Sequence, residues 1–174
     1  MTADRAPGPP EPPGPGSDDA VAAMVASGVP HTVVRHGPVA SLAEAAAARG
    51  VSPGAVIKTL VVRRADDDFL LVLVPGDRGI SWPKLRALLG VSRLSMPDAE
   101  TARAATGYAR GTITPFGARG GWPVVVDTRI ADATTVSIGG GAHGVAFSLT
   151  GADLVAALDT LPGAVQTADV TDPL

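Results

Sequence analysis

Few residues in this chain can do chemistry, and a single lysine is the first of them. Twelve of the 14 basic residues are arginine, and only Lys58 and Lys84 are lysine. Lys58 lies in the apolar run 55–62 (AVIKTLVV), which has the composition of a β-strand. A partly desolvated ammonium group there is a compact positive charge that can bind a phosphate or an oxyanion. The alternative is an edge-strand lysine whose charged end simply reaches water.

A glycine-rich segment, 106–117 (TGYARGTITPFG), is the second candidate. Glycines at 107, 111 and 117 around a fixed proline allow the backbone to approach a ligand closely and to present its N–H and C=O groups. Such a loop can hold a polar group without side-chain chemistry. The same composition also fits an ordinary connection between two elements.

Other catalytic chemistries find little support in the sequence. The chain has no cysteine, which excludes a disulfide framework, a thiol nucleophile and a cysteine-based zinc site. His31 and His36 are too isolated to suggest a metal site, and no catalytic triad is visible. We therefore expect neither a metal ion nor another cofactor.

The elements that must position these candidates follow from capping signals and periodicity. Ser41 and Glu44 form a capping box, and the charged turn 65–68 separates two apolar runs that should pair as an antiparallel hairpin. We expect helices at 20–27, 41–49, 81–89, 97–105 and 151–158, and strands at 31–35, 55–64, 69–75, 123–127, 134–138 and 145–149. This order predicts an α+β fold: a single domain with a mixed, largely antiparallel sheet flanked by helices.

The composition also predicts the domain organisation. Residues 1–17 are rich in proline and glycine and read as a disordered arm, residues 18–160 as the domain, and residues 161–174 as a C-terminal tail. The arm has no apolar segment typical of a signal peptide, and no apolar run is long enough to span a membrane. We expect a soluble, cytoplasmic protein that contacts no membrane.

The net charge of −3 hides a different balance in the predicted domain. The acidic residues concentrate at the two ends, and without residues 1–19 and 159–174 the chain has 13 basic and 10 acidic residues. A core charge of about +3 permits phosphate binding but is well below that of a dedicated nucleic-acid binder.

Several segments occur together in one order: IKTLVV, LVPGDRGISWPKL, GYARGTITPFG, VVVDTRI, IGGGAHGVAFSL and ADL. This order resembles the YbaK/ProX family of aminoacyl-tRNA deacylases, which is related to the editing domain inserted in bacterial prolyl-tRNA synthetases. The resemblance covers residues 20 to 160, and its most specific parts are the lysine strand and the GxxxP motif at Gly111 to Pro115. It implies the fold of the YbaK/prolyl-tRNA synthetase associated domain.

The resemblance implies catalytic roles for Lys58, near the 3′-terminal nucleotide, and for Gly111, whose backbone positions the aminoacyl group. In this family catalysis relies on substrate placement, a ribose hydroxyl and water. The implied substrate-binding residues are Tyr108, Thr112, Thr114, Pro115, Asp127, Gly139, Gly141 and His143. Asp127 can instead start a turn, His143 can face solvent, Tyr108 can pack, and the glycines 139–141 can form a tight turn. Gly139 stands where some members have a serine, so no hydroxyl is present there.

The function that follows is hydrolysis of mischarged aminoacyl-tRNA carrying a small amino acid, namely alanine, serine, threonine or cysteine. The partner is the 3′ acceptor end of the tRNA, with Arg78, Arg110 and Arg119 as candidates for contacting its backbone. The alternative is a catalytically weak module of the same fold that binds a tRNA end or a protein. A hydrolase of free aminoacyl esters is a third possibility. The sequence leaves open whether the protein is a monomer or a homodimer.

Overall fold

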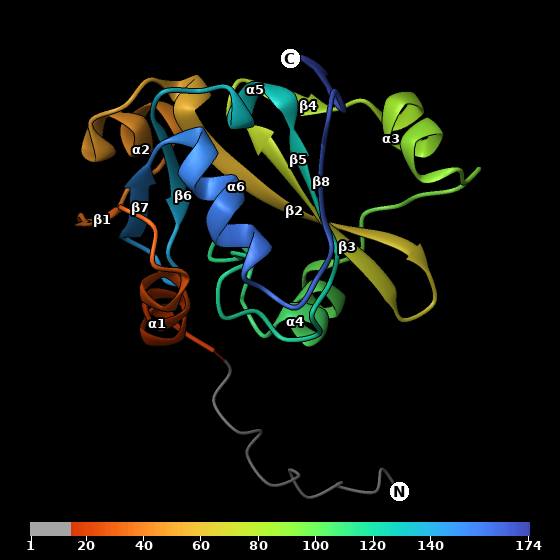
Figure 1. The fold of residues 1–174 in the computed structure, drawn as a ribbon, viewed down its shortest axis with the longest axis horizontal. Helices are drawn as coiled ribbons and strands as arrows, with labels where there is room; N and C mark the ends of the chain where they lie inside the picture. Colours follow the sequence, from red (N-terminus) through yellow and green to blue (C-terminus); the bar gives the residue numbers. More distant parts are fainter. Residues whose placement is uncertain (1–14) are drawn as a thin grey trace, which may run out of the picture.

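The computed structural model describes residues 15–174 (Figure 1). Most of the predicted arm, residues 1–14, lies outside the described residues. Helix α1 (Ser17–Ser27) begins earlier than predicted and includes the last residue assigned to the arm. It starts there because two acidic residues occupy its first turn, where one of them, Asp19, accepts a hydrogen bond from the Gly16 N–H at 3.0 Å.

A seven-stranded sheet with the order β1-β7-β6-β2-β3-β5-β8 forms the centre of the molecule. Its strands are β1 (Thr32–Arg35), β2 (Val56–Ala65), β3 (Asp68–Pro75), β5 (Val124–Asp127), β6 (Val136–Gly139), β7 (Val145–Leu149) and β8 (Val165–Ala168). The pairs β1–β7, β6–β7 and β2–β3 are antiparallel, whereas β2–β6, β3–β5 and β5–β8 are parallel. The α+β fold with a mixed sheet is confirmed, and its parallel pairs are as numerous as its antiparallel ones.

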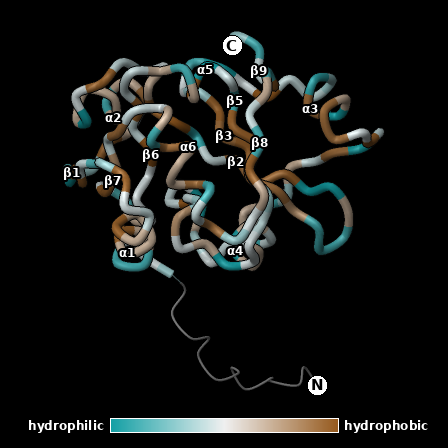
Figure 2. Tube along the Cα trace, viewed as in Figure 1, coloured by the Kyte–Doolittle hydropathy of each residue, from teal (hydrophilic) through white to brown (hydrophobic). Residues whose placement is uncertain are grey.

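Both faces of the sheet are covered, which explains why β3 is apolar along nearly all of its length (Figure 2). On one face, Leu71 and Leu73 share a core with residues of α1 and α6, including Met24 and Leu154. On the other face, alternate residues of the same strands pack with Leu85 of α3. The predicted hairpin β2–β3 therefore lies between two hydrophobic cores, one on each face of the sheet.

The predicted helices are confirmed, with boundaries fixed by their caps. They are α2 (Leu42–Arg49), α3 (Trp82–Leu89), α4 (Ala99–Thr106) and α6 (Gly151–Asp159); a 3-10 turn (Pro53–Ala55) and a short helix α5 (Thr128–Ala131) are additional. The Ser41 and Asp98 side chains accept backbone N–H groups at the starts of α2 and α4, as the capping signals predict. No helix within residues 15–174 has the length and apolar character needed to cross a membrane.

The segment predicted as a C-terminal tail is part of the fold. Strand β8 extends the main sheet beside β5, and β9 (Thr171–Pro173) pairs with β4 (Arg78–Ile80) in a separate antiparallel pair. Thr171 is fully buried. The sequence did not indicate these strands because they are short and polar. Asp169 and Asp172 are typical of a solvent-exposed tail, whereas in the structure both form ion pairs with Lys84.

Candidate active site

Strand β2 is only partly paired on the side that faces β6. The parallel ladder with β6 ends at Ile57, and Ser95 bridges Arg63 farther along through backbone hydrogen bonds of 2.7 and 3.1 Å. Backbone groups that point to one side of a strand recur at every second residue. The backbone N–H and C=O groups of Thr59 and Val61 therefore point to the same side of β2 as those of Arg63. They face the opening between β6 and Ser95.

A cavity of about 670 Å³ lies along this open edge. Its walls come from residues 56–61 of β2, from residues 96–99 at the start of α4, from the loop around Gly111, and from Gly139 at the end of β6. Arg49 and Arg110 also line it. The lysine strand and the glycine loop, far apart in the sequence, thus meet at one cavity.

Lys58 occupies the β2 wall of the cavity with a partly buried side chain. Its Nζ donates a hydrogen bond to the Arg78 carbonyl oxygen at 2.6 Å. Burial lowers the pKa of Lys58, and the nearby negative charge of Asp77 acts in the opposite direction. An ammonium group has three N–H donors, so the bond to Arg78 leaves donors for an anionic ligand. Lys58 is therefore suited to anchor a phosphate or an oxyanion.

Gly111 also lines the cavity, and as a glycine it presents its backbone there. Its φ is +86°, a left-handed conformation that residues with a side chain rarely adopt. The following residue, Thr112, holds the turn closed, because its N–H and its hydroxyl both donate to the Ala109 carbonyl oxygen, at 2.9 and 2.7 Å. The Thr112 hydroxyl is thus used within the loop, whereas the Gly111 backbone forms no hydrogen bond within residues 15–174 and can meet a ligand.

Tyr108 braces this loop from inside. Its hydroxyl donates to the Phe116 carbonyl oxygen at 2.7 Å, and the residue is only 1% exposed. Burial, with a smaller contribution from Asp19, raises the pKa of Tyr108 to about 12. The ring of Tyr108 is therefore packed in the interior and does not line the cavity, which agrees with the packing alternative considered for this residue.

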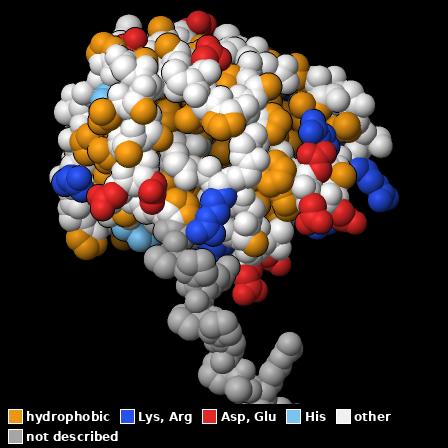
Figure 3. Space-filling view, turned by 60° about the horizontal axis from the view of Figure 1, so that its bottom comes forward, with side chains coloured by type: hydrophobic (Ala, Val, Ile, Leu, Met, Phe, Trp, Pro, Cys, Tyr) orange, Lys and Arg blue, Asp and Glu red, His pale blue; other side chains and the backbone are white. Residues whose placement is uncertain are grey.

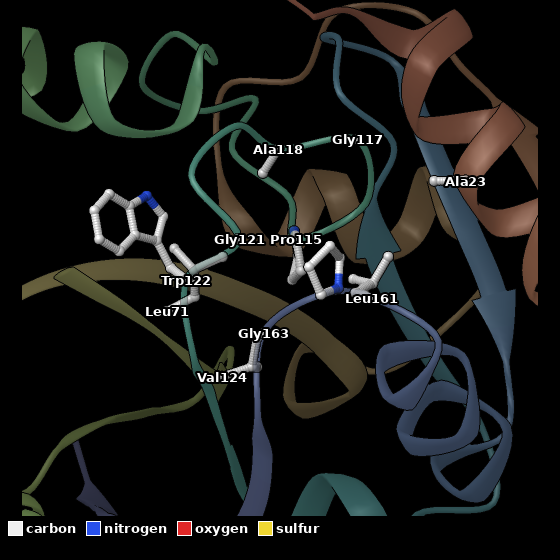
Figure 4. A pocket seen from close by; sticks show the side chains of 11 residues that line it. Ala23, Leu71, Pro115, Gly117, Ala118, Gly121, Trp122, Val124, Leu161 and Gly163 are labelled. Carbon is white, nitrogen blue, oxygen red and sulfur yellow. The ribbon is translucent and has the colours of Figure 1, made fainter.

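Two further predicted substrate residues, Thr114 and Pro115, do not line the cavity. Thr114 is fully buried, and its Oγ1 lies 3.5 Å from the Phe116 backbone nitrogen. Pro115 is buried as well and lines a different, smaller cavity of about 200 Å³, together with Trp122 and Leu161 (Figure 4). Both residues shape the loop rather than line the larger cavity, so their predicted contact with substrate is not supported.

Gly139 does line the cavity, at the end of β6. A Cβ atom added there would have Ile113 O as its nearest neighbour, at 4.0 Å. A Cβ atom would therefore fit at this position without steric conflict. The glycine in this position leaves space at the cavity wall.

Gly141 and His143, in the turn after β6, have different surroundings. A Cβ atom on Gly141 would lie 3.0 Å from Gly16 O and 3.0 Å from Tyr108 Cε1. Gly141 thus allows the first turn of α1 to pack beneath the loop and does not contact the cavity, contrary to prediction. His143 is exposed, and its Cε1 lies 3.2 Å from where a Cβ atom of Gly111 would be. It remains a candidate for substrate contact.

Asp127 is fully buried at the end of β5 and outside the cavity. Its Oδ1 accepts the Arg129 N–H at 3.0 Å, and its Oδ2 accepts the Val170 N–H at 3.1 Å and the Thr171 hydroxyl at 2.9 Å. Asp127 therefore does not line the cavity, and its carboxylate is used within the fold. The alternative, a carboxylate that starts a turn, describes what the structure shows.

Sequence reasoning missed several residues of the cavity. Thr59 is one of them, and its buried Oγ1 has no hydrogen-bond partner among residues 15–174. Met96, 51% exposed, lies at the same cavity and gave no signal in the sequence. A polar residue within an apolar strand could have indicated Thr59. Arg78, considered for the tRNA backbone, instead donates from Nε to the Thr171 hydroxyl at 2.8 Å.

The charges at the cavity are mainly positive. Arg49, Lys58 and Arg110 line it, whereas the carboxylate of Asp98 is used at the start of α4, where it accepts the Thr101 N–H at 2.8 Å. The face in Figure 3 instead shows basic and acidic side chains interspersed among apolar ones. Within the described part of the chain, no group of three or more His, Asp or Glu side chains could hold a metal ion.

Fold and cavity together define a class of protein: a small α+β domain whose ligand site consists mostly of backbone, apolar side chains and a few cations. Residues 36–157 match the model of the aminoacyl-tRNA editing domain. The chain belongs to this family, and the resemblance inferred from the sequence is confirmed.

Similar proteins include synthetases and single-domain structures. Proline–tRNA ligase of Heliobacterium modesticaldum is 36% identical over 94 residues, which are 54% of this chain and 16% of the ligase. The enzyme of Levilactobacillus brevis is 31% identical over 99 residues, 57% of this chain and 17% of the ligase. The chain thus matches about a sixth of the length of these relatives. A crystal structure described as a candidate trans-editing enzyme for prolyl-tRNA synthetase is 25% identical, with a TM-score of 0.78, and the match covers 91% of this chain and 98% of that one.

Proposed function

We propose that this protein is a trans-editing deacylase that hydrolyses the ester bond of mischarged aminoacyl-tRNA. The observation that carries this proposal is the cavity at the open edge of β2, which is lined by both Lys58 and the backbone of Gly111. Membership in the editing-domain family and the similarity to parts of proline–tRNA ligases support the same substrate class. The reaction would take place in the cytoplasm, on charged tRNA.

The acceptor end of the tRNA would enter with its terminal nucleotide toward the cationic side chains. Lys58, Arg49 and Arg110 can bind the phosphate and ribose of that nucleotide, because charge-assisted hydrogen bonds to phosphate are strong. The aminoacyl group would then lie between the exposed backbone of β2 at Thr59 and the Gly111 loop. Backbone groups hold a substrate in a defined orientation because their own positions are fixed by the fold.

Hydrolysis needs a water molecule rather than a nucleophilic side chain. Among the side chains of residues 15–174 that line the cavity, Thr59 has the only hydroxyl and Asp98 the only carboxylate. Hydrogen bonds from the Thr101 backbone lower the pKa of Asp98, which makes it a poor base. In the proposed reaction, water adds to the carbonyl carbon, the ester C–O bond breaks, and the ribose oxygen takes up a proton as the amino acid leaves. A ribose hydroxyl of the substrate would assist the proton transfer.

Selection for a small amino acid would follow from the shape of the cavity. Its inner wall is formed by apolar side chains, including Ile57, Ala102 and Ile113. Rigid walls of this kind exclude residues that are too large, as in the second sieve of editing enzymes. Alanine, serine, threonine and cysteine are the proposed aminoacyl groups.

The test is a deacylation assay on a panel of mischarged tRNAs. We expect Lys58→Met to lower the rate strongly, because it removes the anchoring charge and keeps an apolar stem. Arg64→Met is the matched control: it removes a cation from the same strand, where Arg64 pairs with the partly buried Asp68 at 2.9 Å. If wild type hydrolyses every substrate at the rate of buffer alone, the proposed activity is wrong.

The space left by Gly139 is the observation that favours the second candidate, a module that binds the tRNA end without turnover. That candidate predicts stable, salt-sensitive binding of aminoacyl-tRNA with no release of amino acid. A filter-binding measurement at low and high salt, run beside the deacylation assay, distinguishes the two. Equal rates on tRNA and on free aminoacyl esters would instead indicate a small-molecule esterase.

A further inference from the structure

A chain of hydrogen bonds joins the C-terminal strand to the candidate active site. The Thr171 hydroxyl donates to the buried Asp127 carboxylate at 2.9 Å and accepts from Arg78 Nε at 2.8 Å. Arg78 Nη2 also donates to the Thr171 carbonyl oxygen at 3.2 Å. The carbonyl oxygen of Arg78 in turn accepts the Lys58 ammonium at 2.6 Å. Each of these groups thus has a partner that fixes its direction.

The backbone adds a second connection between the same segments. Strand β9 pairs with β4, with Arg78 opposite Pro173 and Ile80 opposite Thr171. Next to this pair, the Ser81 N–H donates to the Val170 carbonyl oxygen at 2.8 Å. Strand β4 is three residues long and no other strand of the described chain pairs with it, so its position depends on β9.

These residues lie partly outside the segment that defines the family. The family match ends at residue 157, whereas β9 spans Thr171–Pro173. Thr171 and Asp127 are fully buried, although neither lines the cavity. A buried threonine that both donates and accepts a hydrogen bond holds its two partners in one arrangement.

We propose that Thr171 of the C-terminal strand is a positioning residue, which orients the Lys58 ammonium toward the cavity by fixing the Arg78 carbonyl group. The role of Asp127 is then indirect, since its carboxylate orients the Thr171 hydroxyl. For its effect on catalysis this inference rests on the proposed deacylase function. The predicted effect of Thr171 on the Lys58 ammonium is independent of that function.

The test uses the full-length protein and two variants that break the chain at different points. Thr171→Val removes the hydroxyl with little change in shape, and Arg78→Met removes the guanidinium group and keeps the buried bond between Thr171 and Asp127. Thr171→Ser retains the hydroxyl and should restore wild-type behaviour. Arg129→Met is the matched control, because Arg129 pairs with Asp127 and Asp169 but makes no bond to Arg78 or Thr171.

The first readout is independent of tRNA. Lys58 is labelled with an amine-reactive acetylating reagent, and its rate is compared with that of the N-terminal amine by peptide mass spectrometry. We expect labelling to be several-fold faster in Thr171→Val and Arg78→Met, and unchanged in Thr171→Ser and Arg129→Met. Melting curves show whether each variant is folded, and Arg78→Met tests the proposal even if Thr171→Val does not fold. Unchanged labelling of Lys58 in folded Arg78→Met overturns it.

The second readout is deacylation. We expect Thr171→Val and Arg78→Met to lower kcat several-fold in the wild-type background, and to have no further effect when Lys58 is already methionine. A further loss in the Lys58→Met background would mean that Thr171 acts through general structure, and it would overturn the positioning role. If wild type lacks deacylase activity, the proposed function fails, whereas the labelling result still decides the role of Thr171.

Discussion

Replacing Gly111 by alanine is expected to lower activity far more than stability. The backbone at Gly111 has a φ of +86°, and a residue with a side chain costs about 1–2 kcal/mol more than glycine in the left-handed region. The added Cβ would also lie 3.2 Å from His143 Cε1, a contact that a small shift of the exposed histidine relieves. For a domain of this size, a loss of about 1–2 kcal/mol lowers the melting temperature by roughly 2–8 °C.

Activity should respond differently, because Gly111 lines the cavity. A backbone that relaxes from the left-handed conformation moves its N–H and C=O groups, and misplacement by about 1 Å can lower a rate on the order of 10²-fold. Gly90→Ala is the matched control. Gly90 ends α3 with a φ of +66° and has no heavy atom within 4 Å of an added Cβ. It should show the same loss of stability and retain wild-type activity.

The assay is kcat/KM for deacylation of one good substrate, measured beside thermal unfolding followed by circular dichroism. Both variants should unfold at similar temperatures, below that of wild type. Only Gly111→Ala should lose activity, by about 10²-fold. If Gly111→Ala keeps the kcat/KM of Gly90→Ala, the backbone at residue 111 does not position the substrate, and the proposed role of the loop is refuted.

Three further predictions test other parts of the site. Gly139→Ser should change the free energy of unfolding by less than about 0.5 kcal/mol, because the added Cβ has space. The narrower cavity should lower kcat/KM for threonyl-tRNA more than for alanyl-tRNA. An unchanged ratio of the two kcat/KM values would show that residue 139 does not limit the size of the aminoacyl group. Tyr108→Phe should lower the free energy of unfolding by about 1–3 kcal/mol in urea titrations, because it leaves the buried Phe116 carbonyl without its donor; a loss near zero would show that this bond does not brace the loop. Burial lowers the pKa of Lys58 from 10.5, so its positive charge is lost at a lower pH than usual. The deacylation rate, corrected for spontaneous hydrolysis, should therefore fall on the alkaline side with a midpoint below 10.5, and Lys58→Arg should move that fall to higher pH.

Local patterns in the sequence were sufficient to find the main features of the site. Lys58 stands out as a rare lysine inside an apolar strand, and Gly111 lies in a glycine-rich segment of recognisable order. Both line the cavity, as does Gly139. The helices and the hairpin were also predictable, because capping residues and apolar runs are local signals.

Burial within the loop could not be predicted in the same way. Tyr108, Thr114 and Pro115 belong to the expected segment, yet they face the interior, because the direction of each side chain depends on the backbone conformation of the loop and on what packs beneath it. Thr59 was missed for the same reason, since it reaches the cavity only where β6 ends early. Strands β4 and β9 are short and polar, and each forms only because the other, about 90 residues away, pairs with it.

The packing of α1 beneath the glycine loop has a consequence for the order in which the site forms during folding. The first turn of α1, at Gly16 and Ala20, lies against Tyr108 and Gly141, which follow it by about 90 and 120 residues in the chain. Contacts between such distant segments form late, because they close long loops. We expect the cavity to take shape only after the central hairpin has formed, and α1 and the loop to open together as one unit in hydrogen exchange. A deacylase built in this way would become active only in the last step of its own folding.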